Sequence, residues 1–195
     1  MLKIRTLSIL LVLILGALGS WSYFNVNLTS NYEVGEPVDT LNGVVVYYNG
    51  AVGNVSGRNT SADGYNIGLK YQCVEFVKRY YLEHLNHKMP NPWGHAVDFY
   101  DPDVADGKMN RNRGLIQFSN ASKVLPGVKD LIVFEGTTWN PYGHVAIVSA
   151  VHENSIEITQ QNPGPNAPSR ISLRMTKEDD KYKISGGVLG WLRLP

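Results

Sequence analysis

The sequence is organised around Gly68-Leu-Lys-Tyr-Gln-Cys-Val-Glu-Phe-Val-Lys-Arg-Tyr-Tyr-Leu-Glu-His-Leu-Asn86. Gly68 suits a turn, and the residues after it have the periodicity of an amphipathic helix. Cys73 starts a stripe of apolar or aromatic residues on one helix face, which continues through Phe76, Val77, Tyr80 and Tyr81. This stripe is expected to be buried. The charged residues on the rest of the surface are expected to face water; they are Glu75, Lys78, Arg79 and Glu83.

Cys73 lies in the first turn of this helix, and that position favours two different roles. Backbone N–H groups of a first turn have no partner within the helix and carry partial positive charge, which favours a thiolate. A Cys at such a position beside a His can have a lowered pKa, and its thiolate is a nucleophile. The alternative is a small apolar residue of the core, since Cys is among the most frequently buried residue types.

The composition is that of a folded protein with one domain. The chain has 195 residues, of which 43% are hydrophobic, so a sizeable core can form. It contains 18 basic and 17 acidic residues. These nearly equal numbers give no excess of positive charge of the kind that nucleic-acid-binding proteins have. We find no internal repeat and no second domain.

Residues 1–24 have the pattern of a targeting segment. Lys3 and Arg5 precede an uncharged apolar run from Leu7 to Leu18, and Ala17-Leu-Gly19 resembles a cleavage site for a signal peptide. Residues 7–24 are also just long enough for an uncleaved membrane anchor. Either alternative predicts that the body is exported, to the periplasm or the extracellular side.

The single cysteine supports the catalytic interpretation. An exported chain with one Cys forms no internal disulfide, and a leftover thiol in an oxidising compartment is a candidate for reactivity. A purely structural position could hold Ala, Val or Ser without the risk of oxidation. This argument favours Cys73 as a nucleophile.

The remaining sequence predicts a linker at 25–40 and a domain at 41–195 that is rich in strands. A long ordered loop is expected over 51–68, because Gly, Asn and Ser dominate there. A short helix is expected over 93–100. Apolar and β-branched runs predict strands at 43–48, 131–134, 143–151, 156–162, 171–175 and 188–194, of which 143–151 and 156–162 form an antiparallel hairpin.

A thiolate nucleophile needs a base within hydrogen-bonding reach, and that base needs an orienting group. His144 is the best placed of the five His residues, because it follows Gly143 at the mouth of a predicted strand. His95 is a second candidate. The other three lie at the far end of the helix or in a turn: His84, His87 and His152.

Three motifs together resemble the CHAP domain, the cysteine- and histidine-dependent amidohydrolase/peptidase family. They are Tyr71-Gln-Cys-Val-Glu-Phe76, Gly143-His-Val-Ala-Ile147 and Thr159-Gln-Gln-Asn162. The resemblance runs from about Leu41 to the C-terminus, and the first two motifs are specific only as a pair. It implies an α+β, papain-like fold (NlpC/P60-like), with Cys at the N-terminus of a helix packed on an antiparallel sheet.

The resemblance also implies roles for individual residues. Cys73 is the expected nucleophile and His144 the expected general base, oriented by a residue on the following strand. The matching position is Gln160, where many members of the family have Glu. Asn162 is the alternative, since period-two alternation puts both amides on one face of the strand. An amide oxygen can accept a hydrogen bond from the imidazole, but it has no negative charge with which to stabilise the imidazolium.

The oxyanion hole is expected to use the backbone N–H of Cys73 and a donor from the preceding loop, with Gln72 and Asn66 as candidates. Tyr71 and Trp139 are candidates for lining the cleft, and each could equally belong to the core.

We therefore expect an exported, monomeric cysteine amidase or endopeptidase. Its expected substrate is an amide bond of peptidoglycan or of another peptide-like molecule. No cofactor and no metal are expected, and no nucleic-acid partner. Membrane anchoring through residues 7–24 is a further expectation. The alternatives are an amidase for a small γ-glutamyl or polyamine conjugate, and a catalytically silent CHAP-like binding domain.

Overall fold

The computed structural model describes residues 2–25, 32–138 and 140–195, and it has a mixed α+β architecture with antiparallel sheets. The predicted helix is present as α2 (Cys73–Leu85). A further helix, α1, spans Leu2–Asn25, and the predicted helix at 93–100 is reduced to a 3-10 turn, Val97–Phe99. Among these described residues, no helix has both the length and the apolar character required to cross a membrane.

The largest sheet has eight antiparallel strands in the order β11-β10-β9-β8-β7-β12-β6-β5. Five of its strands were expected from the sequence, although their bounds differ: β7 (Leu131–Phe134), β8 (His144–Val151), β9 (Ser155–Thr159), β10 (Arg170–Glu178) and β12 (Val188–Arg193). The other three are β5 (Lys108–Asn110), β6 (Leu115–Ser119) and β11 (Lys181–Ile184). Strands β8 and β9 form the predicted antiparallel hairpin.

Two small antiparallel pairs lie near the helix. The first joins β1 (Pro37–Leu41) to β2 (Val44–Tyr47), and the second joins β3 (Arg58–Thr60) to β4 (Asn66–Leu69). Strand β1 lies partly within the segment expected to be a linker, and β3 and β4 lie within the segment expected to be a loop. These strands have only three to five residues, with no regular alternation of buried and exposed positions along β1 or β4, so strand periodicity could not identify them.

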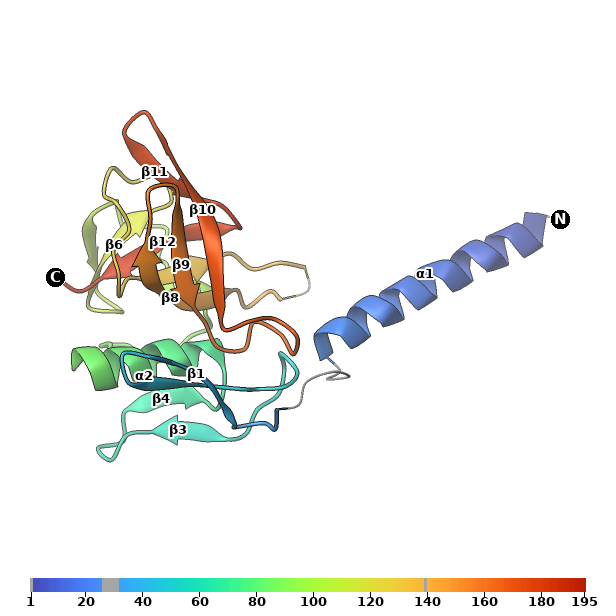
Figure 1. Cartoon of the computed structure of the whole chain (residues 1–195), viewed down its shortest axis with the longest axis horizontal. Coiled ribbons are helices and arrows are strands. Elements are labelled where there is room, and N and C mark those ends of the chain that lie inside the picture. The colour runs from blue at the N-terminus through green and yellow to red at the C-terminus, as the bar shows by residue number, and fades with distance from the viewer. Residues whose placement is uncertain (1, 26–31, 139) are drawn as a thin grey trace.

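Helix α2 is enclosed on more than one side, because it packs against β2, β4 and β8. Figure 1 shows α2 between the large sheet and the small strands β3 and β4, with β1 crossing in front of the helix. The predicted stripe of Cys73, Phe76, Val77, Tyr80 and Tyr81 is buried against the sheet. The side chains of β7 and β8 alternate between this core and a second apolar cluster on the opposite face, which contains Trp191.

The prediction that the charged face of α2 lies in water is wrong for Glu75, Lys78 and Arg79, which are all buried. Glu75 and Arg79 form an ion pair of 2.7 Å. Lys78 donates from Nζ to the carbonyl of Pro92 at 2.8 Å, and burial is the main cause that lowers its pKa to about 7. Helical periodicity identifies the most apolar face, but it does not reveal that β2 and β4 cover the other one.

Candidate active site

Cys73 is the first residue of α2, and Gln72 is the N-cap. The Cys73 side chain is 9% exposed. The backbone N–H groups of Val74, of Cys73 itself and of Val145, the second residue of β8, lie near enough to the sulfur to act on its pKa. The sheet therefore brings the residue next to His144 into contact with the thiol.

Burial raises the pKa of the Cys73 thiol to about 11, although the three N–H groups act in the opposite direction. The expectation of a lowered pKa from the first helical turn is therefore wrong for this state of the protein. The reason is that α2 and β8 remove water from the sulfur, and a thiolate loses more from desolvation than it gains from these donors.

His144 begins β8 and is held by an amide. Its Nε2 lies 3.0 Å from Oε1 of Gln160, and Nε2 of Gln160 donates to the carbonyl of Pro168 at 3.1 Å. The bond to Pro168 fixes which end of the amide faces the ring. Because Oε1 can only accept, the imidazole carries its proton on Nε2, and Nδ1 has the lone pair. Burial lowers the pKa of His144 to about 4.

The sequence left open whether Gln160 or Asn162 contacts His144, and the structure shows that Gln160 does. The pairing of β8 with β9 includes Ile147 opposite Thr159, after which β9 ends. Gln160 then donates its backbone N–H to Ser169, while Asn162 adopts a positive φ of 57° that turns the chain away. A regular continuation of the register would have placed Asn162 opposite His144, but the strand ends before that point.

Asn162 contacts Gln72 instead of His144. Its Nδ2 donates to Oε1 of Gln72 at 2.7 Å and to the carbonyl of Val52 at 2.9 Å. Its Oδ1 is buried without a hydrogen-bond partner among the described residues. Nε2 of Gln72 donates to the carbonyls of Val52 and Asn54. Both amides therefore fix the loop that precedes the helix.

The hydrogen bonds described for the Asn66 amide and the ring contact described for Tyr71 join them to residues other than His144 and Cys73. Asn66 accepts from Arg58 and donates to Pro92, so its amide is engaged on the β4 side of α2. The ring of Tyr71 lies 5.0 Å from that of Tyr47. Trp139 lies outside the described residues. The oxyanion and cleft roles of these residues stay predictions.

Gln161 was not singled out from the sequence, yet it connects three elements. Nε2 donates to the backbone carbonyl of Gln72 at 3.1 Å and to Glu75 at 2.9 Å. Oε1 accepts the backbone N–H of Tyr47 at 2.8 Å. Since neighbouring residues of an extended chain point in opposite directions, Gln161 faces α2 while Gln160 faces His144. This alternation is the sequence pattern from which the position of Gln161 against α2 could have been predicted.

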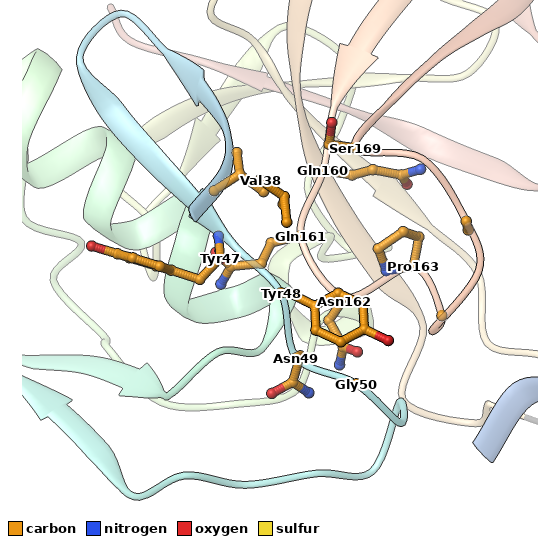
Figure 2. A pocket seen from close by; sticks show the side chains of 13 residues that line it. Val38, Tyr47, Tyr48, Asn49, Gly50, Gln160, Gln161, Asn162, Pro163 and Ser169 are labelled. Carbon is orange, nitrogen blue, oxygen red and sulfur yellow. The ribbon is translucent and has the colours of Figure 1, made fainter. Parts of the chain in front are cut away.

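A pocket lies beside Gln160, between the β1–β2 pair and the chain that follows β9, as Figure 2 shows. Its walls include Tyr48, Gln160, Asn162 and Pro163, whereas Cys73 and His144 do not line it. Separately, no group of three or more His, Cys, Asp or Glu side chains within the described parts of the chain could hold a metal ion.

Residues 62–162 match the family model of the CHAP domain. This chain belongs to the CHAP family. The match spans the helix with Cys73, the strand with His144 and the segment from Gln160 to Asn162. A CHAP domain implies a papain-like fold, with which the observed mixture of a helix and antiparallel strands agrees.

Curated proteins similar to this CHAP-family chain are much longer than it. Trypanothione synthetase of Crithidia fasciculata is 29% identical over 151 residues, which cover 72% of this chain and 23% of the relative. Glutathionylspermidine synthase of the same organism is 33% identical, covering 65% and 19%. The bifunctional glutathionylspermidine synthetase/amidase of Escherichia coli (strain K12) is 29% identical, covering 65% and 22%. The chain thus spans less than a quarter of each relative's length.

The CHAP site of this structure combines a neutral thiol with a neutral imidazole. We expect alkylation of Cys73 by iodoacetamide at pH 7 to be about a hundredfold slower than that of an unperturbed thiol, because a pKa raised to about 11 lowers the thiolate fraction. The rate should rise with pH up to that value. Mass spectrometry of the single-Cys chain measures it directly, and fast labelling at pH 6 would contradict the buried neutral state.

Substitutions of Gln160 test how the CHAP site orients its base. Gln160→Leu removes the acceptor that fixes the tautomer, and we expect kcat/KM to fall by about 10² or more. Gln160→Glu keeps the acceptor and adds charge beside the ring, so it should raise the pKa of His144 from about 4 and move the acid limb of the pH profile upward. An acid limb that does not move in Gln160→Glu would exclude His144 as the titrating base.

Proposed function

We propose that this chain is a cysteine amidase of the CHAP family that hydrolyses peptide-type amide bonds outside the cytoplasm, with peptidoglycan as its substrate. Cys73 is the proposed nucleophile, His144 the general base and Gln160 the residue that orients the base. The family membership supports amide hydrolysis as the reaction class. Export is supported by Lys3 and Arg5 in front of an apolar run, and the cell wall is the abundant amide polymer on that side.

The observation that carries this proposal is the hydrogen bond between His144 and Gln160. It leaves Nδ1 as the basic nitrogen of a residue whose neighbour, Val145, contacts the Cys73 sulfur. The proposal requires the imidazole and the sulfur to meet where β8 packs against the start of α2. The amide at residue 160 thus performs the orienting role that Asn performs in papain-like proteases.

The reaction that follows from these roles has two halves. Nδ1 takes the thiol proton as the sulfur attacks the carbonyl carbon, and the resulting imidazolium gives that proton to the leaving amine. Water then attacks the thioester and gives a proton to His144; the C–S bond breaks, the carboxylic acid leaves, and the thiolate regains the proton from the imidazolium. Because the pair starts neutral, the proton moves only as substrate displaces the remaining water and charge develops on the carbonyl oxygen. The backbone N–H of Cys73 is the proposed donor to that oxygen.

The experiment that tests this proposal incubates the full chain with purified peptidoglycan of several compositions. New amine ends are identified by mass spectrometry, and Cys73→Ser serves as the matched control. We expect products that depend on Cys73. If none of the peptidoglycans yields such a product, the substrate assignment is wrong.

A second candidate substrate is a small conjugate of the glutathionylspermidine type. The observation in its favour is that two of the relatives described above are named for glutathionylspermidine, one as a synthase and one as a bifunctional synthetase/amidase. Incubation with glutathionylspermidine under the same conditions distinguishes the two: release of free spermidine by wild type and not by Cys73→Ser would favour this alternative. A chain that cleaves neither substrate would correspond to a silent binding domain.

A further inference from the structure

Two consecutive amide side chains lie between the elements that carry the proposed base and nucleophile. The amide of Gln160 binds the ring of His144, with Oε1 at 3.0 Å from Nε2. The amide of Gln161 extends toward Tyr47, and Gln160 points the other way, as Figure 2 shows. One peptide unit therefore joins the residue that holds the base to a residue that holds a different part of the fold.

Gln161 holds the start of α2 through a backbone group. Its Nε2 donates at 3.1 Å to the carbonyl of Gln72, which is the N-cap and directly precedes Cys73. The same carbonyl accepts the backbone N–H of Phe76 at 3.2 Å, which is the first hydrogen bond of the helix. Because this carbonyl belongs to the main chain, the bond from Gln161 constrains where the helix begins.

The side chain of Gln161 is itself fixed, since both ends of its amide are bound. It is 0% exposed. Oε1 accepts the backbone N–H of Tyr47 on β2 at 2.8 Å, and Nε2 donates to the buried carboxylate of Glu75 at 2.9 Å. An N–H group can only donate and a carboxylate can only accept, so these partners determine the orientation of the amide. A buried polar network whose members are satisfied is rigid.

The transfer of a proton from a thiol to an imidazole depends on their relative position, and a misplacement of about 1 Å can cost about 10²-fold in rate. Gln160 fixes the ring of His144, and Gln161 fixes the carbonyl that precedes Cys73. Because Gln161 is fully buried, it offers no surface to a substrate. Its effect on a reaction must therefore pass through the residues that it holds.

We propose that Gln161 is a positioning residue for the nucleophile. It keeps the start of α2, and with it the Cys73 sulfur, at a fixed place relative to the base that Gln160 holds. The effect on rate rests on the proposed amidase function, whereas the effect on the sulfur can be measured without catalysis.

The first test compares the same substitution at two buried glutamines. Gln161→Met keeps the length of the side chain but removes its donor and its acceptor. We expect kcat for amide hydrolysis to fall by about 10- to 100-fold and KM to stay within about twofold of wild type. Gln117→Met is the matched control, because Gln117 on β6 is 1% exposed and its amide also binds backbone groups, those of Asp101. It should lose stability but keep kcat.

Chemical denaturation compares the stabilities, and circular dichroism shows that both variants are folded at the assay temperature. A kcat of Gln161→Met that equals that of wild type would overturn the assignment. So would an equal fall of kcat in Gln117→Met, because that result would make the loss a general effect of stability.

The second test needs no substrate, because it measures alkylation of Cys73 by iodoacetamide at pH 7. When the helix start is released, water reaches the sulfur and the thiolate is less strongly disfavoured. We expect Gln161→Met to react at least about tenfold faster than wild type, and Gln117→Met to react like wild type. Equal rates for Gln161→Met and wild type would contradict the positioning role.

A double exchange separates positioning from stability. It combines Glu75→Gln with Gln161→Glu, so that the amide at position 75 can donate to the carboxylate at position 161. That carboxylate can also accept from Arg79 and from the Tyr47 N–H, whose donors already lie 3.4 and 2.8 Å from Oε1 of Gln161. It has no donor for the Gln72 carbonyl.

We expect the double exchange to be more stable than Gln161→Met while its kcat stays low. A kcat that recovers together with stability would show that Gln161 is only structural. If stability does not recover, the comparison of Gln161→Met with Gln117→Met decides the assignment.

These measurements also separate the positioning role from the amidase function. If wild type cleaves no amide in a Cys73-dependent manner but Gln161→Met accelerates alkylation, the function fails and the positioning role stands. If wild type cleaves and Gln161→Met cleaves equally fast, the positioning role fails and the function stands.

Discussion

Cys73→Ala is expected to reduce amide hydrolysis by about 10⁴-fold or more, and His144→Ala should have an effect of similar size. The sulfur is the only thiol in the chain, and it lies near the backbone of Val145, the residue that follows the proposed base His144. Since the two groups act as one unit, the double variant should be scarcely worse than either single one. The measurement is kcat/KM for release of a new amine end.

The control for this prediction is the fold. Cys73→Ala is a small change at a buried position, so the circular dichroism spectrum and the thermal melting curve should stay close to those of wild type. His95→Ala serves as the second control, because His95 contacts Tyr142 rather than the sulfur. A His95→Ala variant that is as inactive as His144→Ala would reassign the base.

Glu75→Ala is expected to destabilise the fold by about 3–5 kcal/mol, because it leaves the buried guanidinium of Arg79 without its ionic partner. Glu75 also accepts from Asn59 and Gln161, so the change removes bonds to two further segments. Chemical denaturation monitored by circular dichroism measures the free energy of unfolding. A value within about 1 kcal/mol of wild type would show that water reaches Arg79.

Two further variants make the interpretation specific. Glu83→Ala changes an exposed carboxylate on the same helix and should alter stability by at most about 0.5 kcal/mol. Replacing both Glu75 and Arg79 by apolar residues of similar size should restore much of the loss, since no unpaired charge remains. If the double variant is as unstable as Glu75→Ala alone, the loss comes from packing or from the bonds to Gln161.

The sequence predicted the parts of the fold that repeat a local period. The apolar stripe of α2 and the continuous apolar runs of β7 and β8 are such patterns, because a single buried face imposes them. It did not predict β3 and β4, whose residues are mostly polar. Nor did it predict that Glu75 and Arg79 are buried, because their partners, Asn59 and Gln161, are distant in the chain.

The motifs pointed to candidate residues for the site, and their catalytic roles stay predictions. The protonation of those residues could not be predicted from the motifs. Helix position argued for a thiolate at Cys73, but burial against β8 outweighs it. Register alone could not choose between Gln160 and Asn162, since the choice depends on β9 ending at Thr159. Both outcomes are set by tertiary contacts that a linear pattern does not contain.

The strand order has a consequence for any attempt to work with a shorter protein. Strand β12, from the last residues of the chain, is inserted between β7 and β6 in the middle of the large sheet. The β1–β2 pair, near the other end, supplies the Tyr47 N–H that Gln161 binds. A fragment cut at the family-match boundaries, 62–162, would therefore expose unpaired edges at the centre of the sheet and should aggregate. The smallest useful expression clone begins before Pro37 and extends through Arg193.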